Sequence, residues 1–202
     1  MKLIASLTSP YVRKIRIALL EKGLTFELVN EPPWEPGNKV CDYNPLGKVP
    51  ALQADDGEIF FNSPVIADYL ETLPAAVRLI PVEALEAVRV KQLEALADGV
   101  TDAGVVWLLE TRRAADKQDA TVIDRQRGKI ERGLDALEHK LQGRDWLYGT
   151  HLSLADIAAG CCVLWLDFRL PQYDWRSSRP NLTAYAKRLA ERAAFVQTVP
   201  VV

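Results

Sequence analysis

The side chains that most often carry chemistry are few in this sequence. Its two histidines, His139 and His151, lack the spacing of metal ligands. Its three cysteines, Cys41, Cys161 and Cys162, form no Cys-x-x-Cys pair. Neither a Gly-x-Ser-x-Gly elbow nor a glycine-rich phosphate loop is present. The pattern therefore speaks against hydrolase and nucleotide chemistry, no metal is expected, and we expect the cysteines to be reduced thiols.

Serine hydroxyls at helix starts are the other chemically useful groups. Ser9-Pro10 and Ser63-Pro64 each combine a preferred N-cap residue with a proline, which is favoured at the first helical position. Both serines are therefore predicted to cap helices. A third start is predicted at Ser153, where Ser-x-x-Asp156 is a variant of the capping box. We interpret Ser153 and Asp156 as structural.

The first of these helices lies in a region that alternates strand-like and helical segments, as α/β units do. Within it, Val12, Ile15 and Leu19 give an apolar stripe. The charged side chains of the same helix are expected to face water or the helix end; they are Arg13, Lys14, Arg16, Glu21 and Lys22. Four strands are predicted around the helices, at Lys2–Leu7, Thr25–Asn30, Val49–Ala54 and Ile59–Phe61.

The resulting order, β-α-β-loop-β-β-α with Pro50 at the head of the third strand, is the pattern of a thioredoxin-like domain. That resemblance implies a cis peptide bond before Pro50. Residues 74–81 are predicted to be a linker, and the remainder has helical periodicity throughout. We therefore expect an α+β fold of two domains, a thioredoxin-like βαβ-ββα domain at 1–75 and an all-α helical domain at 82–202.

Charge and hydropathy exclude two classes of partner. The 25 Lys and Arg against 27 Asp and Glu give a net charge of -2, so no basic excess is available to hold a phosphate backbone. The apolar runs are far shorter than the ~20 residues of a membrane span. The N-terminus lacks the apolar core of a signal peptide. We expect neither nucleic acid nor membrane as a partner, and a cytoplasmic protein.

Several sequence motifs, in order along nearly the whole chain, resemble a bacterial cytosolic-type glutathione transferase. The closest resemblance is to the YibF-like branch, whose first helix follows Thr-Ser-Pro, here Thr8-Ser9-Pro10. The other motifs are Asn44-Pro45-Leu46-Gly47-Lys48-Val49-Pro50, Asn62-Ser63 and Leu152-Ser153-Leu154-Ala155-Asp156. The resemblance implies a homodimer that conjugates glutathione to small hydrophobic electrophiles or reduces organic hydroperoxides. Some members keep the fold without turnover, so the alternative is a non-catalytic ligand-binding or regulatory interaction protein.

The resemblance also implies where glutathione would lie. Its cysteinyl backbone would pair with that of Val49, which cis-Pro50 leaves free, as in strand addition. Its γ-glutamyl carboxylate would lie at the helix opened by Ser63, where free amides and the helix dipole favour an anion. Asn62 stands where relatives often have an acidic residue, and it cannot form an ion pair with the γ-glutamyl amine. Lys48 would meet the glycyl carboxylate.

The catalytic residue implied by the resemblance is Ser9, in place of the nucleophilic cysteine of glutaredoxin-like relatives. A hydroxyl forms no mixed disulfide, so Ser9 would donate a hydrogen bond to the glutathione thiolate. The alternatives are that Ser9 only caps the helix, or that Ser6, Thr8 or Tyr11 is the donor.

The electrophile is expected between the two domains, where the resemblance suggests Tyr11, Trp107, Leu108 and Arg112. A tryptophan on a helix face is more often part of a core than a ligand contact, so Trp107 is the weaker candidate.

Overall fold

The structure, a computed structural model, describes residues 1–201 and divides the chain into two compact units. Unit 1 contains Met1–Val82 together with the residues from Arg192 on. Unit 2 contains Glu83–Glu191. The expected helical domain, 82–202, differs from this division because its last residues cluster with unit 1.

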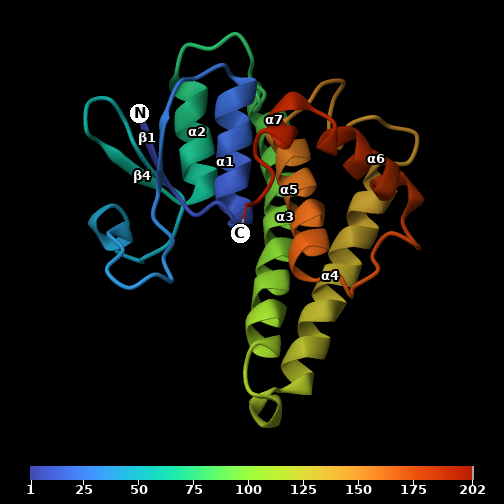
Figure 1. Cartoon of the computed structure of the whole chain (residues 1–202). Helices are drawn as coiled ribbons and strands as arrows, with labels where there is room; N and C mark the ends of the chain where they lie inside the picture. Colours follow the sequence, from blue (N-terminus) through green and yellow to red (C-terminus); the bar gives the residue numbers. More distant parts are fainter. Residues whose placement is uncertain (202) are drawn as a thin grey trace. The chain divides into compact units, whose positions relative to one another are not determined.

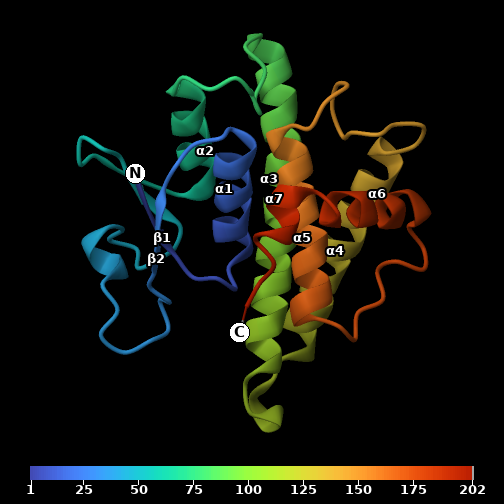
Figure 2. The ribbon, with the colours of Figure 1, turned by 45° about the horizontal axis from the view of Figure 1, so that its top comes forward.

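Unit 1 is built on a four-stranded sheet with the strand order β2-β1-β3-β4 (Figure 1). The strands β1 and β2 are parallel, and β3 is antiparallel to both β1 and β4. Their bounds are Lys2–Ala5, Glu27–Asn30, Ala51–Gln53 and Ile59–Phe61 for β1 to β4. Helices α1 (Pro10–Glu21) and α2 (Ser63–Thr72) lie side by side (Figures 1 and 2). The thioredoxin-like βαβ-ββα order is thereby confirmed.

The loop between β2 and β3 contains one short 3-10 turn, η1 (Val40–Asp42), and ends at a cis peptide bond between Val49 and Pro50. The cis bond agrees with the expectation from the thioredoxin-like resemblance.

The predicted apolar stripe of α1 is correct, because Val12, Ile15 and Leu19 are fully buried. The expectation that the charged side chains of this helix face water or the helix end is wrong for Arg13 and Lys14, which are also buried. Lys22 lies at the helix end as expected, but it is buried too. For Lys22 the reason lies at the far end of α2. The Lys22 Nζ donates to Glu71 Oε1 at 3.0 Å and to the carbonyl of Val77 at 2.9 Å.

The C-terminal residues explain the burial of Arg13. They form a short helix, α7 (Ala193–Val196), which packs on α1. The Arg13 guanidinium donates to the carbonyl of Phe195 at 3.1 Å and to the hydroxyl of Thr198 at 3.4 Å. A segment almost two hundred positions away in the chain thus covers this cation, which no local pattern can reveal.

Unit 2 contains four α-helices and a 3-10 turn, and α3, α4 and α5 lie side by side in it (Figures 1 and 2). Two glycines allow close packing of α3 against α5 and α4. A β-carbon on Gly104 of α3 would lie 2.8 Å from Trp165 of α5, and one on Gly133 of α4 would lie 2.2 Å from Val100 of α3. Among residues 1–201, no helix is long and apolar enough to span a membrane. The elements are α3 (Ala84–Thr111), η2 (Ala115–Lys117), α4 (Ala120–Lys140), α5 (Leu154–Arg169) and α6 (Pro180–Ala190).

The start of α5 confirms the structural role of Ser153 and Asp156. Asp156 is fully buried, and its carboxylate accepts hydrogen bonds from the amides of Ser153 and Leu147 at 2.8 and 2.9 Å. The hydroxyls of Ser153 and Tyr185 donate to it as well, each at 2.7 Å. Burial and then the Asp156 charge raise the pKa of Tyr185 well above its usual value, so the phenol keeps the proton that it donates.

Candidate functional site

Three connections of unit 1 start or end at the same edge of its sheet. The register places Ala51 opposite both Ile4 and Phe61. The chain therefore leaves β1 after Ala5, enters β3 from Pro50 and leaves β4 after Phe61 at one edge. The residues predicted to bind glutathione lie on these three connections or, for Ser63, directly after one of them, so the sheet itself gathers their backbones at that edge.

Ser9 is the N-cap of α1, as predicted. It has extended backbone angles, and its hydroxyl oxygen accepts the amide of Val12 at 3.3 Å. Since a hydroxyl can accept and donate at once, the Ser9 proton stays available for a further acceptor. Capping the helix and donating to a bound anion are thus compatible roles, although the sequence presented them as alternatives.

The neighbouring hydroxyls of Ser6 and Thr8 lie 3.5 Å apart and within hydrogen-bonding reach of each other, and Ser6 is buried. Only one of the two protons is used in that contact. Ser9 differs from both residues because it lies at the N-cap of α1 itself.

The electrostatics of α1 favour an anion near Ser9. The positive end of the helix dipole lies there, and the helix carries Arg13 and Arg16 in the following two turns. Burial, and then the charge of Arg13, lower the pKa of Arg16 from its usual value. The positive end of the helix dipole stabilises a thiolate over a thiol.

The second helix start differs from the prediction by one residue. The N-cap of α2 is Asn62, and Ser63 is the first residue inside the helix. Asn62 has φ 72°, a value that favours glycine and asparagine, and its side chain makes no capping hydrogen bond. The Ser-Pro pattern alone could not show this, because the capping residue is defined by that unusual backbone turn.

Ser63 is 3% exposed, and its hydroxyl forms no hydrogen bond with any other residue in the described range 1–201. The buried side-chain atoms without a hydrogen-bond partner in residues 1–201 are Glu71 Oε2 and Gln126 Oε1, so the Ser63 hydroxyl is open to solvent and can donate to a bound acceptor. Together with the first amides of α2 and its dipole, Ser63 offers an anion-binding helix start.

Asn44 organises the loop that carries Lys48 and Val49, a role that the sequence analysis missed. Its side chain is buried; the amide group donates to the carbonyl of Lys48 at 2.8 Å and accepts the Leu46 amide at 3.0 Å. The Asn-Pro-x-Gly sequence, typical of a turn closed by an asparagine side chain, could have revealed it. The Lys48 side chain is exposed, and Val49 is half-buried.

The chain matches two family models, the N-terminal domain of glutathione S-transferases over residues 8–73 and their C-terminal domain over residues 120–188. It is 46% identical over 200 residues to the GST-like protein YibF of Escherichia coli. The aligned region covers 99% of this chain and 98% of YibF. The chain belongs to the glutathione S-transferase family.

Solved structures of the family extend this similarity to the fold. A glutathione S-transferase from Methylobacillus flagellatus with glutathione bound matches with a TM-score of 0.96 and 42% identity, covering 99% of each chain. One from Methylobacterium radiotolerans in complex with glutathione sulfonate matches with a TM-score of 0.94 and 40% identity, covering 100% of this chain and 95% of that one.

The residues predicted to contact the electrophile in this family member fall into two groups. Trp107 is 6% exposed, with Tyr173 edge-on at 5.4 Å and the guanidinium of Arg127 at 5.5 Å from its ring. It is part of the core of unit 2. Leu108 is half-buried on α3, and Arg112 is the exposed C-cap of the same helix. Tyr11, in the first turn of α1, is half-buried.

No group of three or more His, Cys, Asp or Glu side chains within residues 1–201 could hold a metal ion. The groups that the predicted glutathione site offers are hydroxyls, backbone amides, helix dipoles and the exposed Lys48. This set suits a peptide-like ligand with several charges.

Proposed function

We propose that this chain is a glutathione transferase that conjugates the glutathione thiolate to small hydrophobic electrophiles or reduces organic hydroperoxides. The observation that carries the proposal is the hydroxyl of Ser63 at the start of α2, which forms no hydrogen bond with another described residue and is open to a ligand. It lies on the same sheet edge as the connections that hold Ser9 and Val49. The glutathione bound in the Methylobacillus flagellatus relative supports this ligand.

Unit 1 offers a hydrogen-bonding or charged partner for each part of glutathione. The γ-glutamyl carboxylate would accept from the Ser63 hydroxyl and the first amides of α2, with Asn62 as a neutral partner for the amine. The cysteinyl backbone would pair with that of Val49, which forms no backbone hydrogen bond with the other described residues. Lys48 would meet the glycyl carboxylate.

The thiol would then point to the start of α1, where the Ser9 proton and the positive field of the helix favour the thiolate. In conjugation, the sulfur forms a bond to the electrophilic carbon while the leaving group departs with its electron pair. In hydroperoxide reduction, two glutathione molecules are oxidised to the disulfide, and the hydroperoxide is reduced to an alcohol and water.

For the second substrate we propose contacts with Tyr11, Leu108 and Arg112, and we give Trp107 a supporting role because it is buried. Burial, and then the charge of Arg112, lower the pKa of Arg169 at the end of α5. Because Arg112 is an exposed cation, electrophiles that carry a carboxylate are expected to have a lower KM than their neutral analogues, measured by steady-state kinetics.

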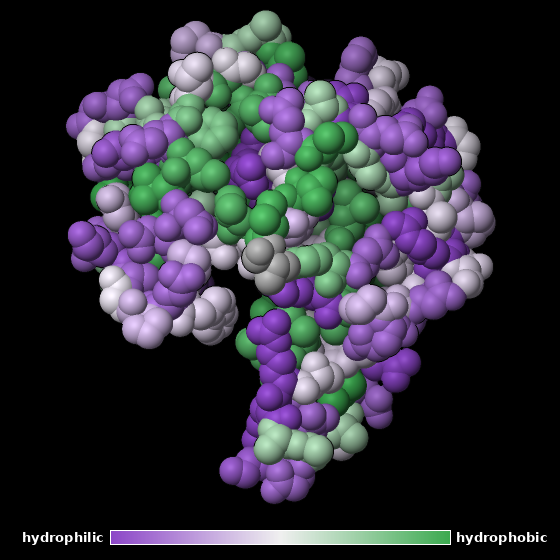
Figure 3. All heavy atoms as spheres, viewed as in Figure 1, coloured by the Kyte–Doolittle hydropathy of each residue, from purple (hydrophilic) through white to green (hydrophobic). Residues whose placement is uncertain are grey.

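We further propose a cytoplasmic homodimer. Three free cysteines suit a reducing compartment. Apolar side chains reach the surface (Figure 3), and Leu85 and Val88, about one turn apart on α3, are 54% and 60% exposed. Exposed apolar side chains on one helix face suit a contact surface. Sedimentation equilibrium that gave the mass of a single chain would rule out the dimer.

The alternative is a ligand-binding or regulatory protein of this fold without turnover, and one observation favours it. Asn62 is neutral and exposed at the place where an acidic residue would pair with the γ-glutamyl amine. Binding without turnover against a panel of aryl halides and organic hydroperoxides would support this alternative. Turnover with any of them would support the transferase.

Ser63→Ala tests the glutathione site directly. Removing one hydrogen bond to a charged group should weaken glutathione binding by about 1.5 to 3 kcal/mol, measured by calorimetry. Asn62→Gly removes the side-chain amide but keeps the positive φ, so it tests the side chain alone. The loss of glutathione affinity should be smaller than in Ser63→Ala. Ser178→Ala, in unit 2, is the matched control. Unchanged affinity in Ser63→Ala would exclude this placement of the γ-glutamyl group.

A further inference from the structure

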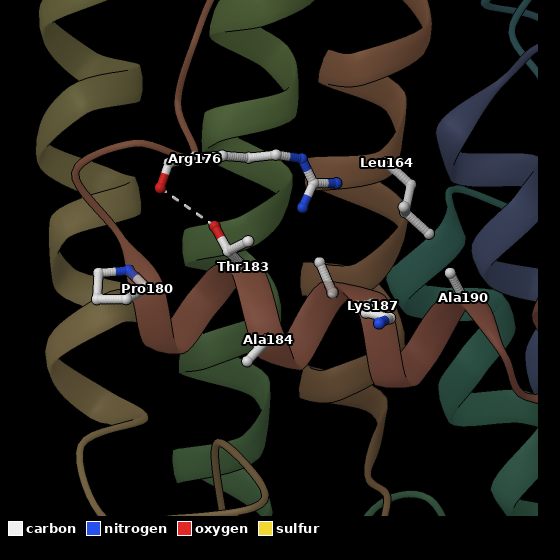
Figure 4. Close-up of a pocket in the computed structure, with 8 residues that line it drawn as sticks. Leu164, Arg176, Pro180, Thr183, Ala184, Lys187 and Ala190 are labelled. Atoms are coloured by element: carbon white, nitrogen blue, oxygen red, sulfur yellow. Dashed lines mark hydrogen bonds between the residues drawn. The ribbon is translucent and has the colours of Figure 1, made fainter.

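A hollow with a volume of about 630 Å³ lies along α6 in unit 2 (Figure 4). Small-molecule sites usually have volumes of about 300 to 1,000 Å³. Its walls come from α6, from Leu164 on α5 and from Arg176 in the segment that joins the two helices. Most of the α6 residues follow the three- and four-residue steps of one helix face. They are Pro180, Thr183, Ala184, Ala186, Lys187 and Ala190.

The floor of this groove is apolar. The side chains of Ala184, which is exposed, and Ala190, which is half-buried, end at the β-carbon and leave space above the helix, whereas Ala186 is fully buried. Leu164, half-buried on α5, adds an apolar wall. A ligand in the groove would therefore lie with a hydrocarbon part against α6 and remove apolar surface from water.

The polar groups of the lining are already engaged, except for one. The Arg176 guanidinium pairs with Asp167 at 2.6 Å and lies 4.3 Å from the ring centre of Trp175. The Thr183 hydroxyl donates to the Arg176 carbonyl at 3.2 Å, drawn dashed in Figure 4. Lys187 is exposed and has no ion-pair partner among residues 1–201, and no acidic residue lines the groove.

We propose that this groove binds a small organic anion with an unbranched apolar chain, of the medium-chain carboxylate class. The carboxylate of the ligand pairs with the Lys187 ammonium, and the hydrocarbon chain of the ligand lies along α6 toward Leu164. Charge complementarity selects the anion, because the lining offers an uncompensated cation and no carboxylate. The site belongs to unit 2 alone and is independent of the glutathione site proposed in unit 1.

Octanoate is a suitable probe, titrated calorimetrically into the full-length protein in the presence of S-hexylglutathione, which occupies the proposed transferase site. Lys187→Gln should weaken octanoate binding about fivefold, the range of an exposed ion pair. Lys129→Gln removes the same charge from an exposed position on α4 and should change nothing. Neutral octan-1-ol should bind the wild type about as weakly as octanoate binds Lys187→Gln.

Ala184→Trp tests the location of the chain. Ala184 is exposed, so the indole fills the groove without entering the core, and thermal unfolding checks that the variant is folded. Octanoate binding should be lost. Retention of wild-type affinity in either Ala184→Trp or Lys187→Gln would overturn the proposal, as would the absence of binding to the wild type at millimolar octanoate.

Discussion

The hydroxyl of Ser9 accepts the Val12 amide and still has a proton to donate. If that proton goes to the glutathione thiolate, Ser9→Ala removes a donor to the charged form. The pKa of bound glutathione should then rise by about one unit, which corresponds to ~1.4 kcal/mol. Turnover near neutral pH should fall with it. Loss of the cap should cost about 1 kcal/mol of unfolding free energy besides.

The thiolate absorbs in the ultraviolet, so titrating the glutathione complex from about pH 5 to 9 reports its pKa. Ser9→Thr keeps both the cap and the donor and serves as the control. Ser9→Cys should gain thiol-transfer activity, because a thiol at a helix N-terminus becomes a low-pKa nucleophile. Superimposable titrations of the wild type and Ser9→Ala at equal occupancy would reduce Ser9 to a helix cap.

The three cysteines differ in what surrounds them. All are free; Cys41 is exposed, whereas Cys161 and Cys162 are buried in α5. Burial is the main cause that raises the pKa of Cys162 to about 12. Because the thiolate is the reactive form, a thiol reagent should label Cys41 alone in the native protein and all three cysteines in denaturant. A disulfide, or rapid native labelling of α5, would contradict the packing.

Among the elements, α5 depends most on one buried charge. Asp156 accepts four hydrogen bonds from Leu147, Ser153 and Tyr185, and so joins the preceding loop and α6 to the start of α5. Asp156→Ala leaves those donors buried without a partner. The free energy of unfolding should fall by at least about 2 kcal/mol in urea titrations, without a change in glutathione affinity. Asp145→Ala, at a surface ion pair, should cost under about 1 kcal/mol.

Elements with local signals were predictable from the sequence. The cap at Ser9, the stripe of Val12, Ile15 and Leu19, and the capping box before α5 each depend on residues within one or two helical turns. The edge of the sheet where the site lies followed from the order of elements and from Pro50. Such local signals do not depend on contacts between distant residues, so they can be recognised in the sequence alone.

What the sequence could not reveal depends on residues far apart in the chain. A local sequence pattern predicts that charged residues such as Arg13 and Lys22 are exposed. They are buried because Phe195 and Glu71, far away in the chain, accept their hydrogen bonds. The capping role of Asn62 depends on one φ angle that is set by the turn after β4. Sequence analysis therefore predicted the elements that carry the proposed site and misjudged the charged face of α1.

For the molecule as a whole, the chain builds unit 2 from one continuous segment and unit 1 from two. The last segment is held to α1 by Arg192, which contacts both carboxylate oxygens of Glu21 at 3.1 and 2.8 Å. Arg13 adds its hydrogen bonds to Phe195 and Thr198. These contacts make the C-terminal residues a structural part of the thioredoxin-like unit, which carries the proposed glutathione site.

Deleting residues 192–202 should therefore expose the buried face of α1 and increase local opening of that helix. Hydrogen exchange measures this directly, since an amide exchanges at a rate set by the opening free energy. The amides of α1 should lose protection, while those of α4 in unit 2 serve as the internal control and keep theirs. Arg192→Gln, which removes the partly exposed pair with Glu21, should cost about 1 kcal/mol. Unchanged protection of α1 in the truncated chain would show that unit 1 is stable without its second segment.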